Sequence, residues 1–208
     1  MCIRDSCQSV GVPDSSDPKR EAILSSALIQ FSRYGFRRTS MADIAKETGV
    51  SRASLYSYFE NKDEIFRSLA TALHEQSLAT AESHLKDVAG GRPIASRVED
   101  AILGRFASFH EVVSQSAHGA EIYDENNRLC GELVVSSSKR FAGMLTKALS
   151  AAARAGEIDL QGAGLSAPAA AELIHLGAAG LKQNASDVAT LEKRVRSFVR
   201  VFFAGLAG

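Results

Sequence analysis

Residues 35–66 read GFRRTSMADIAKETGVSRASLYSYFENKDEIF, and this stretch decides the fold of the chain. A first short helix is expected to open at Ser40, because Asp43 follows three residues later in the pattern of a capping box. This helix ends near Gly49, which can adopt the positive φ that a tight turn needs. A second helix then begins at Ser51. Two short helices joined by a glycine turn form a helix-turn-helix pattern.

The spacing within the second helix, residues 51–59, separates an inner face from an outer one. Val50 and Leu55 are expected to fill the space between the two helices, alongside Ile44. The outer face then carries small and polar side chains, namely Arg52, Ala53, Ser54, Tyr56 and Ser57. A helix with such a face can enter the major groove of DNA and read the base edges there.

The sequence on either side of this stretch also has the pattern of helices. Asp17 followed by Pro18 is a typical helix start. No stretch shows the alternation of a strand, and the chain is rich in alanine and poor in proline. The sequence therefore predicts an all-α fold. Helices are expected at 18–34, 61–88, 94–114, 128–155, 168–185 and 187–206, with a short helix or turn at 117–124 and a loop at 157–166.

The composition excludes several classes of protein. The chain has 208 residues, of which 45% are hydrophobic and 23% charged, as in ordinary globular proteins. Its three cysteines are Cys2, Cys7 and Cys130, an odd number that implies no disulfide framework and favours the reducing cytoplasm. No apolar run approaches the roughly 20 residues of a membrane span. Residues 1–16 lack helical periodicity, and we expect a disordered tail there that need not be native.

The stretch at residues 35–66 closely resembles the DNA-binding signature of TetR/AcrR-type transcriptional regulators. The resemblance covers about residues 19–70, whereas the remainder matches only in length and helix pattern. It implies a helix-turn-helix DNA-binding domain at 17–66 and a helical effector-binding and dimerisation domain at 67–208. The matching positions are Gly35, Thr39-Ser40, Asp43-Ile44-Ala45, Gly49-Val50-Ser51, Leu55-Tyr56, Tyr58-Phe59 and Lys62.

The resemblance also implies a function and a mechanism. The expected protein is a homodimeric repressor that binds a palindromic operator in double-stranded DNA and is released by a small-molecule effector. Effector binding would shift the helix at 61–88 and change the distance between the two recognition helices. These helices must lie about 34–36 Å apart, or a multiple of that, to meet successive major grooves. The effector would therefore act by population shift.

Individual residues receive roles from the same resemblance. Thr39 and Ser40 are expected to bind a phosphate at the start of their helix, and Lys62 is expected to clamp another. Arg52 is expected to read a base, bidentate to guanine in the favourable case. The other expected DNA contacts are Ala53 with a thymine methyl group, Ser54 and Ser57 with base or backbone, and Tyr56 and Tyr58 with phosphate.

The last two helices carry patterns that suit a dimer interface. The helix at 187–206 is apolar on two faces, so one face could cover its own core and the other a partner. Small residues in the helix at 168–185 would allow close approach of another helix. The alternative is that these faces only cover the core of one protomer. The expected interface residues are Leu173, Gly177, Leu181, Leu191, Val195, Phe198 and Phe202.

An effector pocket is expected between the middle helices, where apolar side chains are mixed with a few polar ones. Each candidate could equally be an ordinary core residue. The candidate lining residues are Phe106, Phe109, His110, Val113, Ile122, Tyr123, Leu133, Phe141 and His175.

Three alternatives accompany this interpretation. His110, His118, Glu121 and Glu125 suggest a metal-responsive regulator, because the last three would share one face of a helix. A DNA-binding protein without an effector is the second alternative. An enzyme is disfavoured, because the sequence has no Gly-rich phosphate loop, no Gly-x-Ser-x-Gly elbow and no His-Glu-x-x-His motif. Catalytic residues, a cofactor and a membrane partner are accordingly not expected.

The formal net charge is zero, with 24 basic and 24 acidic side chains, but the charges are unevenly distributed. Residues 31–62 contain six basic and three acidic side chains, whereas residues 110–132 contain one basic and five acidic. The net charge of zero is thus the sum of a mildly basic part that is expected to face DNA and an acidic part that is expected to belong to the effector-binding domain. We expect the acidic part to disfavour anionic effectors if its carboxylates line the pocket.

Overall fold

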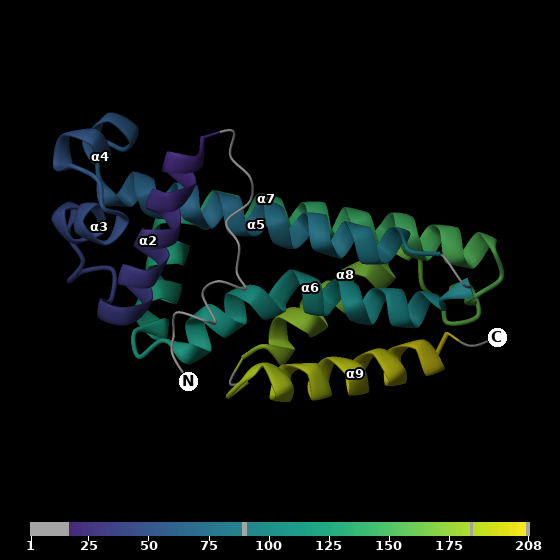
Figure 1. Ribbon diagram of the computed structural model, residues 1–208. Helices are drawn as coiled ribbons and strands as arrows, with labels where there is room; N and C mark the ends of the chain where they lie inside the picture. Colours follow the sequence, from purple (N-terminus) through teal and green to yellow (C-terminus); the bar gives the residue numbers. More distant parts are fainter. Residues whose placement is uncertain (1–16, 89–90, 184, 207–208) are drawn as a thin grey trace. The chain divides into compact units, whose positions relative to one another are not determined.

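The computed structural model describes residues 17–88, 91–183 and 185–206, apart from the side chains at 107–113 and 115. The long regular elements in these ranges are all α-helices, which confirms the all-α prediction (Figure 1). They are α2 (Pro18–Tyr34), α3 (Met41–Thr48), α4 (Arg52–Tyr58), α5 (Lys62–Lys86), α6 (Ile94–Gln115), α7 (Gly119–Arg154), α8 (Ala167–Leu181) and α9 (Val188–Ala204).

Polar side chains fix the starts of these helices as the sequence predicts. The Asp17 carboxylate accepts hydrogen bonds from the amides of Lys19 and Arg20 at the start of α2. Ser40 and Asp43 form the expected capping box of α3. Such caps satisfy amides that have no partner inside the helix, typically for about 1 kcal/mol each.

Helix α7 differs from the prediction only in where its two parts meet. The span Gly119–Arg154 consists of two helical segments joined at a kink at Cys130, so a short helix and a long helix are present as expected, but they meet at Cys130 rather than between residues 124 and 128. The backbone bends at Cys130, where φ is −126° and ψ is 19°. Gly131 follows directly, and glycine weakens a helix where it occurs. The sequence therefore indicates the division into two helical segments but places it a few residues too early.

The chain divides into two compact units. Unit 1 comprises residues up to Gln76 together with Glu111–Val134, and unit 2 comprises Ser77–His110 and Val135–Gly208. Helices α5, α6 and α7 each contribute residues to both units. The domain boundary that the sequence predicts at residue 66 is ten residues before the division observed within α5, between Gln76 and Ser77. Residues 111–134 are grouped with the N-terminal unit.

Unit 1 holds the helix-turn-helix around an aromatic core. The rings of Phe31, Phe36 and Phe66 have centroids 5.2–5.7 Å apart. Leu55 of α4 and Ile44 of α3 are completely buried in the same core. Helices α3 and α4 lie next to each other in Figure 1. This core gives α4 a fixed inner face, which determines the side chains that it presents outward.

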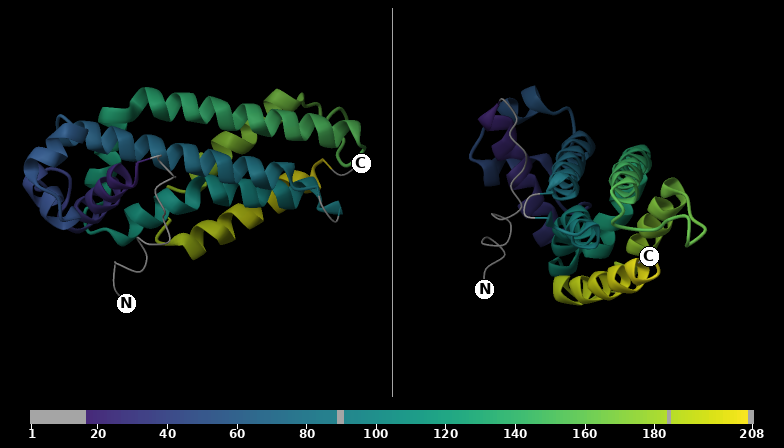
Figure 2. Two further views of the ribbon diagram at one scale, coloured as in Figure 1. Left: turned by 45° about the horizontal axis from the view of Figure 1, so that its top comes forward. Right: turned by 90° about the vertical axis from the view of Figure 1, so that its right-hand side faces the viewer.

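Unit 2 is a helical bundle formed by the later part of α5, the earlier part of α6, the C-terminal part of α7, and helices α8 and α9. Phe141, Leu145 and Leu149 of α7 lie at its centre with no exposed surface. Helix α9 lies beside α6 and α8 in all views (Figure 1, Figure 2). No helix in the described ranges is both long enough and apolar enough to cross a membrane.

Candidate DNA-binding site

The turn between α3 and α4 has the geometry that the sequence predicts. Gly49 is in the left-handed region, with φ 76° and ψ 24°. The Val50 amide donates a 3.0 Å hydrogen bond to the Ala45 carbonyl, which closes the turn. The Ser51 hydroxyl caps α4 by accepting a hydrogen bond from the Ser54 amide. These interactions hold the first turn of α4 in a defined position.

Helix α4 presents the expected outer face. Arg52, Ala53, Tyr56 and Ser57 are exposed, whereas Ser54 is half-buried. In the described part of the chain Arg52 makes no ion pair, so its planar guanidinium can bind a base edge or a phosphate. The Ser57 hydroxyl donates to the Ser54 carbonyl at 2.7 Å and can still accept a hydrogen bond.

Tyr58 is placed differently from its neighbour Tyr56. Its hydroxyl is hydrogen-bonded to Asp17, and Lys19 lies over its ring at 5.8 Å. Burial and the Asp17 carboxylate raise the pKa of Tyr58. The expected contact between this hydroxyl and phosphate would therefore compete with the bond to Asp17. Tyr56, with 49% of its surface exposed, is the better placed of the two tyrosines.

Thr39 and Ser40 do not offer free hydroxyl groups as we expected. Thr39 is buried, and its hydroxyl lies 2.7 Å from the Gly35 carbonyl and 3.3 Å from the Gln30 carbonyl. The Ser40 hydroxyl donates to Asp43 at 2.6 Å and accepts from the Asp43 amide. These side chains shape the start of α3, so a phosphate here would have to use backbone amides instead.

Lys62 also has a role that the sequence analysis missed. Its ammonium group donates to the carbonyls of Phe36, Arg37 and Thr39 at 2.7–3.2 Å and lies 4.5 Å from the Phe36 ring centroid. An ammonium group has three donors, and all three are used here. Lys62 therefore fastens the loop before α3 to the start of α5 and has no donor left for the predicted phosphate clamp.

Two carboxylates of α7 bind Arg37 in the loop before α3. Glu121 accepts a 2.7 Å hydrogen bond from the Arg37 amide, and Glu125 lies 3.5 Å from the Arg37 guanidinium. Glu125 is buried and also pairs with Arg128 at 2.6 Å. The sequence signal was the spacing of four residues between the two acids, which correctly indicated a shared helix face. The metal alternative would use this face for a metal ion, whereas in the structure its carboxylates bind Arg37.

This arrangement does not support the metal alternative. His118 Nδ1 lies 3.9 Å from Glu121, but Glu121 and Glu125 are engaged by Arg37 and Arg128. Within the described ranges no three histidine, cysteine or acidic side chains are grouped as metal ligands. The side chain of His110 lies outside the described residues.

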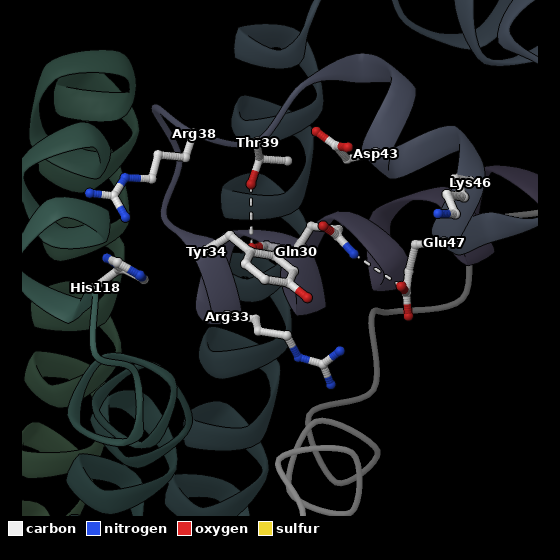
Figure 3. A pocket seen from close by; sticks show the side chains of 9 residues that line it. All are labelled: Gln30, Arg33, Tyr34, Arg38, Thr39, Asp43, Lys46, Glu47 and His118. Carbon is white, nitrogen blue, oxygen red and sulfur yellow. Dashed lines mark hydrogen bonds between the residues drawn. The ribbon is translucent and has the colours of Figure 1, made fainter.

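A groove runs along α2 and α3 on this unit (Figure 3). Arg33, Arg38 and Lys46 line it as exposed cations, and Gln30 donates a 3.0 Å hydrogen bond to Glu47. Its other lining residues are Tyr34, Thr39, Asp43 and His118. The groove is open and of mixed charge, so it lacks the apolar walls expected of an effector pocket.

The predicted effector residues belong to different units. Ile122 is buried in the core of unit 1, Leu133 packs against that core and Tyr123 is exposed. In unit 2, Phe106 and Phe141 pack with ring centroids 6.2 Å apart, and His175 lies 6.1 Å from Phe141. The side chains of Phe109, His110 and Val113 lie outside the described residues. The described candidates are thus divided between the two units, and their role as an effector lining stays a prediction.

The predicted dimer residues also need correction. Leu191 and Val195 are completely buried in the core of unit 2, so they cannot meet a partner. A β-carbon on Gly177 would lie 2.6 Å from Phe198 of the same chain, so this glycine allows α8 and α9 to pack within one protomer. Leu181, Phe198 and Phe202 are half-buried against the same core.

Leu173 is the predicted interface residue that remains exposed. Its exposed fraction is 49%, and the sequence analysis overlooked Leu176 on α8 and Val201 on α9, which are 59% and 70% exposed. Their signal was apolar side chains on the face of each helix opposite the buried positions.

Comparison with known proteins agrees with this site. Residues 23–69 match the family described as bacterial regulatory proteins, tetR family. The HTH-type transcriptional regulator YfiR of Bacillus subtilis is 30% identical over 91 residues, which are 38% of this chain and 44% of YfiR. The chain thus aligns with less than half the length of this curated relative.

Solved structures match over nearly the whole chain, at lower identity. A TetR transcription regulator from Haloarcula marismortui has a TM-score of 0.72 at 14% identity, covering 90% of this chain and 97% of that one. SmeT, solved as a complex with triclosan, has a TM-score of 0.63 at 20% identity and covers 89% and 91%. Identities this low indicate a shared fold. Residues 23–69 therefore match the DNA-binding part of the tetR family of bacterial regulatory proteins, and the chain as a whole shares the fold of solved regulators of that family.

Proposed function

We propose that this protein is a sequence-specific DNA-binding transcriptional repressor that acts as a homodimer. The observation that carries the proposal is the outer face of α4. Leu55 anchors the helix in the core, and Arg52 and Tyr56 extend from its opposite side without ion pairs in the described ranges. Relatives that match over this region are transcriptional regulators rather than enzymes.

Phosphate contacts would come from the exposed cations around the helix-turn-helix. Arg38 and Lys46 are exposed beside α3, and Tyr56 is exposed on α4. Lys62 and Thr39 act indirectly in this proposal, because they hold the loop that sets the position of α3. Contacts to phosphate fix the register of a protein on DNA, whereas contacts to base edges supply specificity. Arg52 is the residue to which we assign specificity.

Dimerisation follows from what one recognition helix can achieve. A single α4 contacts only one half-site, and a two-fold symmetric dimer reads a palindrome with two. The exposed leucines Leu173 and Leu176 on α8 and the exposed Val201 on α9 are the apolar side chains that a partner would cover. The half-buried Phe198 and Phe202 would extend that surface.

Release by a small molecule is the finer part of the proposal. SmeT, which shares this fold, is known as a triclosan complex, so this arrangement of helices can hold a small ligand. In our proposal the effector binds unit 2 and shifts the population towards a dimer whose recognition helices no longer fit successive grooves.

The decisive experiment is selection of bound genomic DNA followed by a titrated gel shift. Arg52→Ala should weaken operator binding by about 1–3 kcal/mol and relax specificity at one base pair. Arg154→Ala, which removes an exposed arginine at the end of α7, is the matched control and should bind as the parent does. An Arg52→Ala variant with unchanged affinity and unchanged sequence preference would refute the assignment. Diffuse coating of DNA instead of one short footprint would refute the repressor proposal.

A further inference from the structure

Unit 2 contains a cluster of cationic side chains around two aromatic rings. Arg105 of α6 is buried and donates hydrogen bonds to the hydroxyls of Ser77 and Ser137 at 3.1 and 2.9 Å. Its guanidinium carbon lies 5.5 Å from the centroid of the Phe106 ring, and Lys182 Nζ lies 5.2 Å from the same centroid. The cationic groups of Arg105 and Lys182 thus both lie close to the Phe106 ring.

His175 of α8 adds a polar atom that the fold does not use. Its Nδ1 is buried and has no hydrogen-bond partner in the described part of the chain. The ring packs against Phe141 at 6.1 Å, and Phe141 in turn packs against Phe106. A buried polar atom without a partner costs free energy, and in native proteins it commonly marks a functional site or a missing ligand.

The charges in this cluster oppose one another. Burial, with the nearby Arg140, lowers the pKa of Arg105 to about 10. Burial and Arg105 lower the pKa of Lys182, and burial with both cations lowers the pKa of His175. Lys182 forms no ion pair within the described ranges. Lys182 therefore supplies a desolvated positive charge in unit 2 that an anion would stabilise.

We propose that unit 2 binds an organic carboxylate as effector, with the carboxylate at Lys182, His175 and Arg105 and the apolar body against Phe106 and Phe141. This inference rests on the proposed effector-controlled function and names the chemical class of the effector. It reverses the expectation from charge distribution, because all five acidic residues between positions 110 and 132 lie in Glu111–Val134, which belongs to unit 1. The aromatic pair accounts for an apolar body, which a small inorganic anion lacks.

The test uses isothermal titration calorimetry on the full chain with matched pairs of probes. The probes are hexanoate, octanoate, decanoate, benzoate and cinnamate, each compared with its own primary amide, which has a similar shape but no charge. At least one acid should bind at least about tenfold more tightly than its amide, corresponding to about 1.4 kcal/mol. If every amide binds as well as its acid, or if inorganic phosphate binds as tightly as the best acid, the proposal is wrong.

Two variants locate the binding on this cluster. Lys182→Met keeps the length and apolar character of the side chain while removing the charge, and it should weaken binding of the best acid at least about tenfold. Lys139→Met, on an exposed position of α7, is the control and should bind the acid as the parent does. Equal acid binding by Lys182→Met and the parent would overturn the proposal.

A parallel gel shift separates this inference from the proposed function. DNA bound by Lys182→Met should resist release by the acid, whereas DNA bound by Lys139→Met should be released as it is from the parent. Operator binding that no acid weakens would refute the carboxylate effector while leaving DNA recognition intact. Failure of the parent to bind any specific DNA would instead refute the proposed function, whatever the calorimetry shows.

Discussion

Gly35→Ala is expected to be one of the most damaging small substitutions in unit 1. Gly35 ends α2 with φ 84° and ψ 157°, a backbone region that is open essentially to glycine alone. A β-carbon at this position would lie 2.5 Å from Glu121 Oε2 on α7. The alanine methyl group would therefore strain the backbone and displace the carboxylate that holds the Arg37 amide.

The magnitude follows from these two effects. A residue held in a sparsely populated backbone region costs about 1–3 kcal/mol. Loss of a hydrogen bond to a charged group, here the 2.7 Å bond from Arg37 to Glu121, costs about 1.5–3 kcal/mol. We therefore expect Gly35→Ala to lower the free energy of unfolding by about 2.5–6 kcal/mol.

Gly49→Ala is the matched control. Gly49 also has a positive φ, 76°, but nothing lies within 4 Å of the position its β-carbon would occupy. Its cost should be limited to the conformational penalty of about 1–2 kcal/mol. Urea unfolding followed by circular dichroism, at one fixed protein concentration, would compare both variants with the parent.

A third variant tests the contact itself. In Gly35→Ala/Glu121→Ala the obstructing carboxylate is gone, so the two changes together should cost less than the sum of the single changes. If Gly35→Ala destabilises the protein no more than Gly49→Ala, or if the double variant is additive, the reasoning about Glu121 is refuted.

Three further outcomes are expected. Lys62→Met should lower the free energy of unfolding by about 2–3 kcal/mol in urea, because three backbone carbonyls lose a charged donor; an unchanged midpoint would contradict this role. Hydrogen bonds from the Ser40 hydroxyl and amide lower the pKa of Asp43 below its ordinary value of 3.8. The stabilisation by the Asp43 carboxylate is therefore complete above pH 3.8 and is lost as the pH falls through the lower pKa of the folded state. The stability difference between the parent and Asp43→Asn, measured by thermal unfolding, should thus narrow below about pH 4, and a constant difference would exclude this cause. Leu173→Glu should shift light scattering from dimer to monomer mass, and an intact dimer would remove α8 from the interface.

The sequence was most informative where local rules apply. The Ser40–Asp43 capping box, the left-handed Gly49 and the buried Leu55 were all predicted and all found. Caps, turns and the inner face of one helix depend on residues only a few positions apart. The all-α fold follows from the same signals repeated along the chain.

The sequence was least informative where residues distant in the chain meet. The resemblance assigned Lys62 to a phosphate. Its three carbonyl partners lie 23 to 26 positions earlier in the chain, so the local sequence pattern could not indicate them. Glu121 was a candidate metal ligand in one alternative, since it shares a helix face with His118 and Glu125. Its actual partner, Arg37, lies 84 positions away and could not be identified from the sequence. The spacing of Leu191 and Val195 suits a dimer interface as well as it suits the core of one protomer, and the structure buries both in the core. Periodicity identifies an apolar face but does not identify what covers it.

The sequence by itself thus determined the helices, the helix-turn-helix and the side chains that α4 presents, since these depend on backbone conformation and helical period. Tertiary structure alone decided which charged groups are already engaged. It assigned Lys62 and Glu121 to the loop before α3, left Arg52 without a partner in the described ranges, and gathered Arg105, His175 and Lys182 in unit 2. The physical reason is that the effect of a charge depends on its desolvation and its neighbours, which only packing brings together.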